Sequence, residues 1–284
     1  MTFIELLVVL AIIGVLIGLT VPAIQLARDA GNRTHCANNL RQIGMGLHRY
    51  HDANKVLPPG MSYRDGTDPY LYMSWNTRLL PYLEQPGLWD VAQKAYAQRP
   101  DPFWNNPPHP LDTVLSLYAC PADAHAASPG QFNVAFTSYL GVQGVNQIRL
   151  DGVLFVDSQV RFADVRDGLS NTLFVGERPP GAGDHFGYWY AGHGNNKDGT
   201  GDMVLGVRTL NIGAWGVECP FGPYAYGPGL SSNFCDVFHF WSLHPGGAHF
   251  LFGDGSVHFL AYSVDSLMPA LATRSGGDVV PSFD

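Results

Sequence analysis

A long apolar segment near the start of the chain constrains the fold more than any other feature. Residues 6–24 read LLVVLAIIGVLIGLTVPAI, with no ionisable side chain and one hydroxyl. A helix of about 20 such residues spans the core of a bilayer. A secretory signal peptide would place Lys or Arg before the segment, whereas here Glu5 is the charge that precedes it and a helical pattern follows it. We therefore expect a membrane-competent helix rather than an ordinary signal peptide.

The helix is expected to extend well beyond the apolar segment. Apolar side chains recur three or four residues apart, with arginines on the other faces, at Leu26, Ala27, Ala30, Leu40, Ile43, Leu47 and Tyr50. This pattern predicts one helix that ends near His51. At 1.5 Å per residue, about 50 residues make a rod of roughly 75 Å, so half of it must leave the membrane and pack elsewhere. Gly14 and Gly18 weaken the helix, and Pro22 removes a hydrogen bond, so a kink or melted turn is expected there.

The chain accordingly divides into an apolar helical segment over residues 1–27, its amphipathic continuation over residues 28–54 and a globular head over residues 55–284. Glu5 is the one charged side chain in the first of these segments. A carboxylate in an apolar environment is costly unless a cation or hydrogen-bond donor accompanies it. Glu5 therefore requires a positively charged partner.

Composition excludes two classes of protein. The net charge is −8 and 14% of the residues are charged, so the surplus of Lys and Arg that a nucleic-acid backbone requires is missing. A hydrophobic content of 46% over 284 residues provides a sizeable core and excludes intrinsic disorder.

The head is predicted to combine short helices, loops and a sheet. Prolines between residues 53 and 110 leave room for a helix over 76–98 that is interrupted near Pro86. Short stretches rich in Val, Phe and Tyr predict strands at 152–156, 172–176, 203–207, 237–241, 249–252 and 256–261. Asp254 and Gly255 lie between the last two, as in a two-residue type I′ hairpin turn. The expected fold class is α+β, with a long N-terminal helix packed on an antiparallel sheet and extensive loops.

Four cysteines occur in a head that the anchor would place outside the cytoplasm, where disulfides form. Three connectivities are possible. We favour Cys36–Cys120, which ties the rod to the head, and Cys219–Cys235, which closes a loop rich in Gly, Pro and Tyr. Zinc is the alternative, although the sequence contains neither a C-x2-C pair nor clustered Cys and His residues.

Three histidines near the C-terminal end, with Asp254, are the best candidates for metal chemistry: His244, His249 and His258. A structural role explains them as well. Asp254 and Gly255 fit a turn, His249 and His258 share an alternating hairpin pattern, and His244 can form a hydrogen bond across the following Pro-Gly-Gly. We therefore expect no metal here.

Oxygen ligands for calcium are available at Asp164, Asp167, Asn171 and Glu177. The alternatives are a turn at Asp167 and Gly168, a cap at Asn171, and an ion pair of Glu177 with Arg178 or Arg166. Nucleophile-elbow, phosphate-loop and metalloprotease motifs are missing from the sequence, so we expect neither an enzyme nor a tightly bound cofactor.

Aromatic residues gather in the glycine-rich stretch 179–236, at Tyr188, Trp189, Tyr190, Trp215, Tyr224 and Tyr226. Exposed, they would form a face that binds a sugar or a surface. Packed beneath loops or against a neighbouring subunit, they would be structural.

The first 24 residues, MTFIELLVVLAIIGVLIGLTVPAI, resemble the mature N-terminus of type IV pilins and type II secretion pseudopilins, with Thr2, Glu5 and Pro22 at the family's positions. The resemblance implies that a prepilin peptidase removes a short basic leader and N-methylates Met1. Phe is usual at that position, so a translation-start methionine is the alternative. The resemblance also provides Glu5 with its cation, the α-amino group of residue 1 on a neighbouring subunit or on its own chain.

Five further segments, at 35–52, 79–89, 120–123, 165–177 and 242–260, resemble large pilin-like proteins with a C-terminal His-x9-Asp-Gly module, here His244, Asp254 and Gly255. The resemblance implies a structural subunit of an extracellular type IV pilus-like filament, held in the inner membrane before assembly. Its partners would be copies of itself, joined through the N-terminal helix with Gly14, Gly18 and Pro22, and the assembly machinery. The alternatives are a pseudopilin of a type II secretion-like system and a membrane-anchored enzyme or ligand-binding protein.

Overall fold

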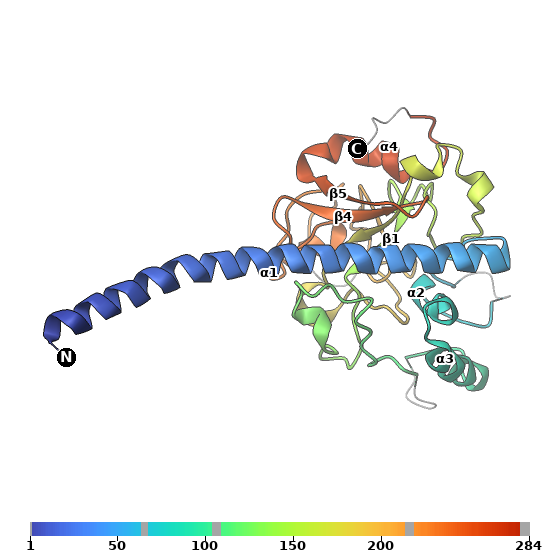
Figure 1. The fold of residues 1–284 in the computed structure, drawn as a ribbon. Helices are drawn as coiled ribbons and strands as arrows, with labels where there is room; N and C mark the ends of the chain where they lie inside the picture. The colour runs from blue at the N-terminus through green and yellow to red at the C-terminus, as the bar shows by residue number, and fades with distance from the viewer. Residues whose placement is uncertain (1, 64–67, 104–108, 214–218, 279–284) are drawn as a thin grey trace.

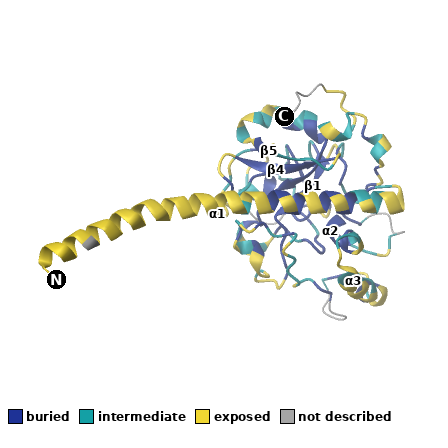
Figure 2. Ribbon diagram, viewed as in Figure 1, coloured by how far each residue is buried: buried dark blue, intermediate teal, exposed yellow. Residues whose placement is uncertain are grey.

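The computed structural model describes residues 2–63, 68–103, 109–213 and 219–278, and shows a long helix that ends on a folded head (Figure 1). The helix α1, Phe3–Asn54, has 52 residues. Its first half projects away from the head, and its second half lies across it (Figure 2). Thr2 begins the helix as N-cap, and Lys55 ends it in the left-handed conformation with φ 64°. The predicted single helix is therefore confirmed, three residues longer than expected.

The predicted break at Pro22 is wrong. The helix continues through Pro22 without interruption, and its free half curves gently (Figure 1). Proline removes one backbone donor, but the neighbouring turns keep theirs, and this exposed helix can bend slightly to make room for the ring.

The packed half of α1 begins at Cys36, about three turns after Leu26, where the amphipathic pattern starts. Leu26 is 71% exposed and belongs to the free half, whereas Cys36, Leu40, Ile43 and Leu47 are buried. These four side chains recur every three or four residues and therefore form one face of the helix. At about 1.5–3 kcal/mol for each large side chain, their burial holds the helix on the head.

Close approach and polar contacts fix α1 on the head. A Cβ atom at Gly44 would lie 2.8 Å from Leu251 Cδ1, so only glycine permits this spacing without rearrangement. Asn39, buried at its side chain, donates hydrogen bonds to the carbonyls of Ser116 and Ala119, each at 3.2 Å.

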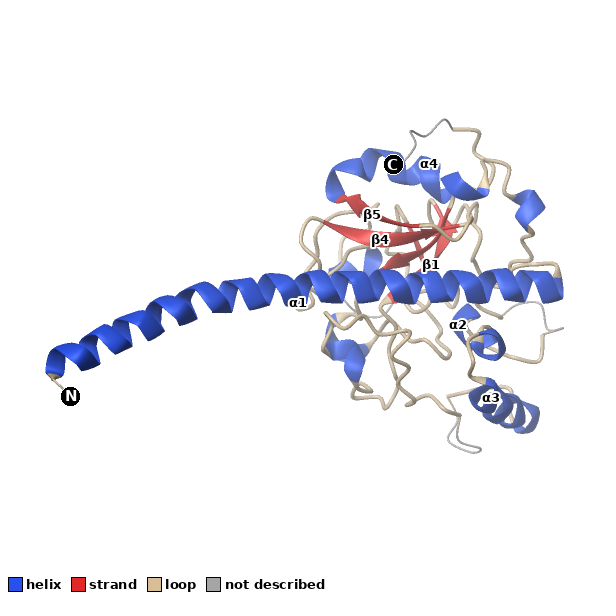
Figure 3. Cartoon of the chain, in the orientation of Figure 1, coloured by secondary structure: helices blue, strands red, loops and turns tan. Residues whose placement is uncertain are grey.

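The head contains a five-stranded sheet in the order β3-β1-β2-β4-β5 (Figure 3). The strands are β1 Tyr139–Gly144, β2 Leu173–Glu177, β3 Val204–Gly206, β4 Gly247–Phe252 and β5 Val257–Ala261. The β1/β2, β2/β4 and β4/β5 pairs are antiparallel, and β3 runs parallel to β1. The predicted α+β fold, a long helix on a mostly antiparallel sheet, is confirmed.

The sheet separates two parts of the core. On the side of α1, Ile43 and Leu47 pack in one cluster with Leu251 of β4. Phe250 and Phe252 of the same strand belong to a second cluster with Met268 and Leu271. The alternation follows from the two-residue repeat of a strand, which sends successive side chains to opposite faces.

Short helices complete the head. The predicted helix over 76–98 appears as α2 Trp75–Arg78 and α3 Pro86–Gln98, and Pro86 is the first residue of α3. Proline suits a helix start because its missing N–H needs no partner there. The remaining helices are α4 Met268–Ala272 and the 3-10 helices Leu80–Tyr82, His125–Ala127, Phe162–Asp164, Leu169–Asn171, Ala182–Asp184, Phe234–Phe238 and Tyr262–Leu267.

Four predicted strands are present with shifted bounds, and two are wrong. Residues 152–156 form turns beside β1, with a single bridge from Val156 to Met61. Residues 237–241 fall partly in the 3-10 helix Phe234–Phe238, whose start is capped by the Asn233 side chain. The sequence prediction missed β1, because YLGVQG contains two glycines, a residue depleted in strands.

The turn between β4 and β5 also differs from the prediction. Asp254 and Gly255 do lie in it, but among its residues Gly255 alone has a positive φ, 88°. A type I′ turn requires two such residues. Phe252 donates to the Ser256 carbonyl at 2.9 Å, so the loop has three residues and ends in a left-handed glycine.

Candidate functional site

The free half of α1 is an apolar surface without partners in a single chain. The large apolar side chains that the structure describes between Phe3 and Leu26 are 45–76% exposed. Among the described residues, α1 is the helix that is long and apolar enough to cross a membrane. Water does not sustain a contiguous apolar surface of this size, so this half must lie in lipid or against other apolar helices.

Glu5 has a defined place at the tip of this surface. Its backbone N–H donates to Thr2 Oγ1 at 3.3 Å, and its Oε2 accepts a hydrogen bond from the Thr2 N–H at 2.7 Å. This reciprocal pair is a capping box, which satisfies two of the free donors at a helix start. The sequence analysis missed it, although the T-x-x-E spacing is its signature. Met1, the predicted site of N-methylation and a possible partner of Glu5, lies outside the described residues.

Gly14 and Gly18 lie on the free half, where an added Cβ would meet nothing within 4 Å. A side chain at either position is therefore sterically acceptable in the single chain. The predicted role of both glycines in assembly stays a prediction.

The structure contains two disulfides, with the pairing that the sequence favours. Cys36–Cys120 joins the first packed turn of α1 to the head across 84 positions, and its two residues are buried. Cys219–Cys235 spans 16 positions near the surface of the head.

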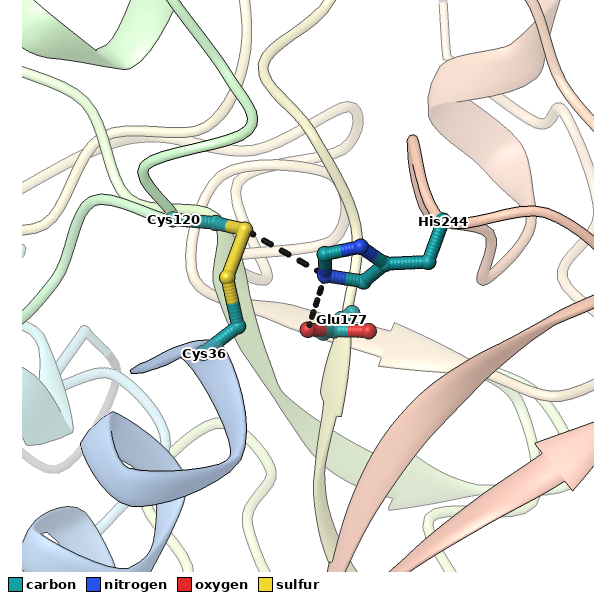
Figure 4. Close-up of side chains that lie close together, drawn as sticks. All are labelled: Cys36, Cys120, Glu177 and His244. Atoms are coloured by element: carbon teal, nitrogen blue, oxygen red, sulfur yellow. Dashed lines mark hydrogen bonds and ion pairs between the residues drawn. A yellow bond between two sulfur atoms is a disulfide. The ribbon is translucent and has the colours of Figure 1, made fainter. Parts of the chain in front are cut away.

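Three further buried side chains gather at the first disulfide, and Figure 4 shows two of them, Glu177 and His244. Glu177 ends β2, His249 lies in β4 next to it, and His244 lies in the loop that leads into β4. Together with Cys36 and Cys120 we call these residues the disulfide cluster. All five are at most 6% exposed.

Glu177 is the centre of the disulfide cluster. Its Oε2 accepts a hydrogen bond from the His249 N–H at 2.7 Å, and its Oε1 lies 3.1 Å from His249 Nδ1. His244 Nε2 lies 3.5 Å from Glu177 Oε1 and 3.6 Å from Cys120 Sγ. Burial by itself raises the pKa of Glu177, but the hydrogen bonds of His244 and His249 more than offset it and hold that pKa below its usual value. The group therefore stays ionised inside the head.

The predicted partners of Glu177 are wrong. The structure pairs it with His249 and His244 rather than with Arg178 or Arg166. Strand register explains the difference, because β2 and β4 are hydrogen-bonded neighbours.

The four candidate oxygen ligands for calcium have separate partners. Asp164 forms an ion pair with Arg161 at 2.8 Å. Asp167 accepts hydrogen bonds from the backbone of Gly276 at 2.6 Å and of Gly277 at 2.9 Å. The predicted cap at Asn171 is wrong: this residue lies inside the 3-10 helix Leu169–Asn171, and its side-chain amide donates to the Asp167 carbonyl at 3.0 Å. Because Glu177 belongs to the disulfide cluster, the four side chains do not converge on one ion.

The C-terminal histidines do not form one group either. His244 and His249 lie side by side, with ring centroids 5.5 Å apart, whereas His258 Nε2 lies 3.1 Å from Ser256 Oγ. Asp254 Oδ1 accepts a hydrogen bond from the Ser256 N–H at 2.9 Å, which supports its role in the turn.

The aromatic residues of the 179–236 stretch form no continuous exposed face. Trp189, Tyr190 and Tyr226 are buried, and Trp215 lies outside the described residues. Tyr224 is half-buried, and its ring lies 5.2 Å from the Phe238 ring at an angle of 39°. For the three buried residues the structural alternative holds, because their rings belong to the hydrophobic core clusters of the head.

Tyr188 instead lines a cavity of about 530 Å³, with Phe103, Phe132, His193 and Asp202 among its other lining residues. This volume falls in the range of pockets for small ligands, and most of the lining is apolar or aromatic.

Two buried charged side chains occur in this region: Asp202, which lines the cavity, and Arg178, whose charge acts on it. The Arg178 guanidinium, fully buried, donates to the carbonyls of Pro179 and Gly201. Asp202 accepts a hydrogen bond from the Gly194 N–H at 2.6 Å. Burial raises the pKa of Asp202 to about 7, although the Gly194 N–H and the charge of Arg178 oppose this shift.

Asp202 therefore makes the stability of the head depend on pH. The raised pKa means that the folded head keeps this proton up to about pH 7, whereas the unfolded chain releases it near the ordinary pKa of the carboxyl. The free energy of unfolding is therefore highest below that ordinary pKa and falls as the pH rises to about 7. Urea unfolding measures the free energy of unfolding between about pH 4 and about pH 8. Over this range, we expect that free energy to fall by up to about 4 kcal/mol more in wild type than in Asp202→Asn. The exposed substitution Asp52→Asn is the control and keeps the wild-type profile. Parallel pH profiles for wild type and Asp202→Asn would contradict this assignment.

A family model described as "Protein of unknown function (DUF1559)" matches residues 25–267. The match covers most of the chain, including the packed half of α1 and all five strands. No curated protein and no solved structure matches the chain significantly.

Proposed function

The chain belongs to the DUF1559 family, and we propose that it is the structural subunit of an extracellular type IV pilus-like filament, inserted in the membrane before assembly. Its pilin-like apolar helix indicates membrane insertion or secretion, and its two disulfides indicate a location outside the cytoplasm.

One observation carries the proposal: a helix that is half buried in a folded head and half exposed as an apolar rod. A bilayer accommodates the rod of a single subunit, and a parallel bundle of the same rods accommodates it outside the bilayer. At about 1.5–3 kcal/mol for each large apolar side chain, bundle formation has ample driving force once the rod leaves the lipid. The head then lies on the outside of the filament.

Glu5 gives the bundle its register. In one chain its carboxylate accepts one hydrogen bond, from the Thr2 N–H, and an ionised carboxylate can accept more. In an apolar bundle it would require a cation, and the α-amino group of Met1 on a neighbouring subunit provides one. A subunit out of register would leave the charge unpaired, so correct stacking is favoured over other arrangements.

Processing and assembly follow from the same proposal. A prepilin peptidase would expose and methylate residue 1, and an assembly machine would move subunits from the membrane into the filament. A pseudopilin in a secretion system uses the same features and forms shorter fibres.

The cavity favours a second candidate function, a ligand-binding head on a pilin-like anchor. Such a protein would work as a single subunit in the membrane, so changes in the rod that block filaments would leave it active.

Glu5→Ala tests the filament proposal. We expect the head to fold and the rod to insert in the membrane, while the yield of sheared fibres seen by electron microscopy falls at least about tenfold, equivalent to about 1.4 kcal/mol. Asp29→Ala removes a carboxylate from the exposed, polar part of the same helix and is expected to leave the yield unchanged.

Thr2→Ala separates the two roles of Glu5, because it removes the capping box and keeps the carboxylate. A normal fibre yield with Glu5→Ala would contradict the proposal. An equal loss with Thr2→Ala would assign the defect to helix capping instead of subunit register.

A further inference from the structure

We infer that the disulfide cluster is also a metal site: in the dithiol state of the protein, Cys36, Cys120, Glu177 and His244 bind one zinc ion. Their ligand atoms all lie within 4.8 Å of one another and all four residues are buried. Among the described residues this is the one group of three or more Cys, His, Asp and Glu side chains so close together.

The distances fit a tetrahedral ion. Zinc lies about 2.3 Å from sulfur and about 2.0 Å from nitrogen or oxygen, which places sulfur and nitrogen about 3.5 Å apart and nitrogen and oxygen about 3.3 Å apart. His244 Nε2 lies 3.6 Å from Cys120 Sγ and 3.5 Å from Glu177 Oε1. Two edges of the tetrahedron are therefore already present around one imidazole nitrogen.

The remaining change is small. The two sulfurs must separate to about 3.8 Å, the sulfur–sulfur edge of a tetrahedral site. The Cα atoms of Cys36 and Cys120 are 5.2 Å apart, so rotation of the two side chains about their Cα–Cβ bonds moves the sulfurs apart. The backbone of α1 and of the head can keep its place.

The charges fit as well. Among the described residues, the ion-pair partners of Glu177 are two imidazoles, and neither Lys nor Arg lies within ion-pair distance of its carboxylate. A buried carboxylate is costly without a strong positive partner, and a divalent ion provides one. His249 fixes the Glu177 carboxylate through its N–H, which donates to Oε2, and through Nδ1, which lies 3.1 Å from Oε1.

The donor set selects the metal. Two thiolates, one imidazole and one carboxylate in four-coordinate geometry are typical of zinc, whereas calcium and magnesium prefer oxygen alone. With no ligand position left for water, the site would be structural. It would fasten α1 to the head in place of the disulfide.

Metal and disulfide are alternative states of the same two sulfurs. When the zinc-bound thiolates of Cys36 and Cys120 react with a small-molecule disulfide, they lose two electrons and form the S–S bond. The reagent's disulfide takes up these two electrons and two protons and leaves as two thiols, and Zn²⁺ is released. The first packed turn of the rod is thus held by the metal before oxidation and covalently after it.

Cobalt titration of the full-length chain in detergent tests the inference. After reduction, we expect one Co²⁺ per chain, with the thiolate charge-transfer absorption of two sulfurs and displacement by Zn²⁺. Oxidised glutathione should abolish the absorption. Glu177→Gln and His244→Ala are each expected to weaken Co²⁺ binding at least about tenfold. Cys219→Ser with Cys235→Ser, the matched control, should leave the absorption unchanged.

Three results would overturn the inference. The first is a reduced, folded chain that shows no thiolate absorption with Co²⁺, and the second is an unchanged Co²⁺ affinity in His244→Ala. The third is absorption that is lost in the Cys219→Ser/Cys235→Ser control but persists in Cys36→Ser/Cys120→Ser. Near-ultraviolet circular dichroism monitors the fold throughout. If reduction unfolds the head, Zn²⁺ is expected to restore the signal, and a failure to restore it also overturns the inference.

Discussion

Replacing both Cys36 and Cys120 with serine is expected to lower the free energy of unfolding of the head by about 4.5 kcal/mol. The disulfide closes a loop of 84 positions, and its removal gives the unfolded chain the entropy of that loop. It also releases α1 from the head at its first packed turn. Urea unfolding of the oxidised full-length chain in detergent, with a chelator present, measures the difference.

Cys219→Ser with Cys235→Ser is the matched comparison, because it also removes one disulfide. Its loop spans 16 positions, for which the same relation gives about 3 kcal/mol. We therefore expect the first pair of substitutions to be the more harmful. The reverse order would show that the link between rod and head contributes little to the stability of the head.

Arg178→Ala is expected to lower the free energy of unfolding of the head by about 3–5 kcal/mol. This is the usual cost when one buried charge is removed and the groups that interacted with it stay buried without it. The guanidinium is fully buried and donates to the carbonyls of Pro179 and Gly201, which would lose their donor. Asp202 and Asp123, both buried, would also lose the positive charge that stabilises their ionised forms. Thermal and urea unfolding provide the measurement.

Arg149→Ala is the control for this substitution. Arg149 forms an ion pair with Asp151 at 2.7 Å, but its side chain is 60% exposed. Exposed ion pairs contribute about 0–1 kcal/mol, so this variant should remain close to wild type. Equal effects of the two substitutions would mean that the surroundings of Arg178 admit water.

The rod could be predicted from the sequence because its signal is local. Apolar residues follow one another over 6–24, and the later three- and four-residue spacing identifies the face that packs. The limits of the packed face could not be predicted. Leu26 and Ala27 fit the apolar pattern as well as Leu40 does, and only the position of the head decides which of them is buried.

The disulfide cluster could not be predicted from sequence spacing, although the pairing of its two cysteines was. Cys36, Cys120, Glu177 and His244 come from four distant segments, and no two of them are closer than 57 positions in the chain. Patterns such as C-x2-C detect metal sites built from local turns. A site assembled by a long helix, two loops and a strand leaves no such pattern, so the lack of one did not exclude zinc.

The position of Cys36 also determines how the head would respond to tension applied along the rod. A helix that is pulled from one end normally detaches from its support turn by turn, because each step breaks only a few contacts. Here the first buried residue of α1 is the one that is crosslinked, one turn after Arg33 stacks on Phe259. Tension along the rod therefore passes through a covalent bond into the head before it reaches Leu40, Ile43 and Leu47. These contacts would then be loaded together in shear, and detachment from the N-terminal side would stop at Cys36 while the disulfide is intact.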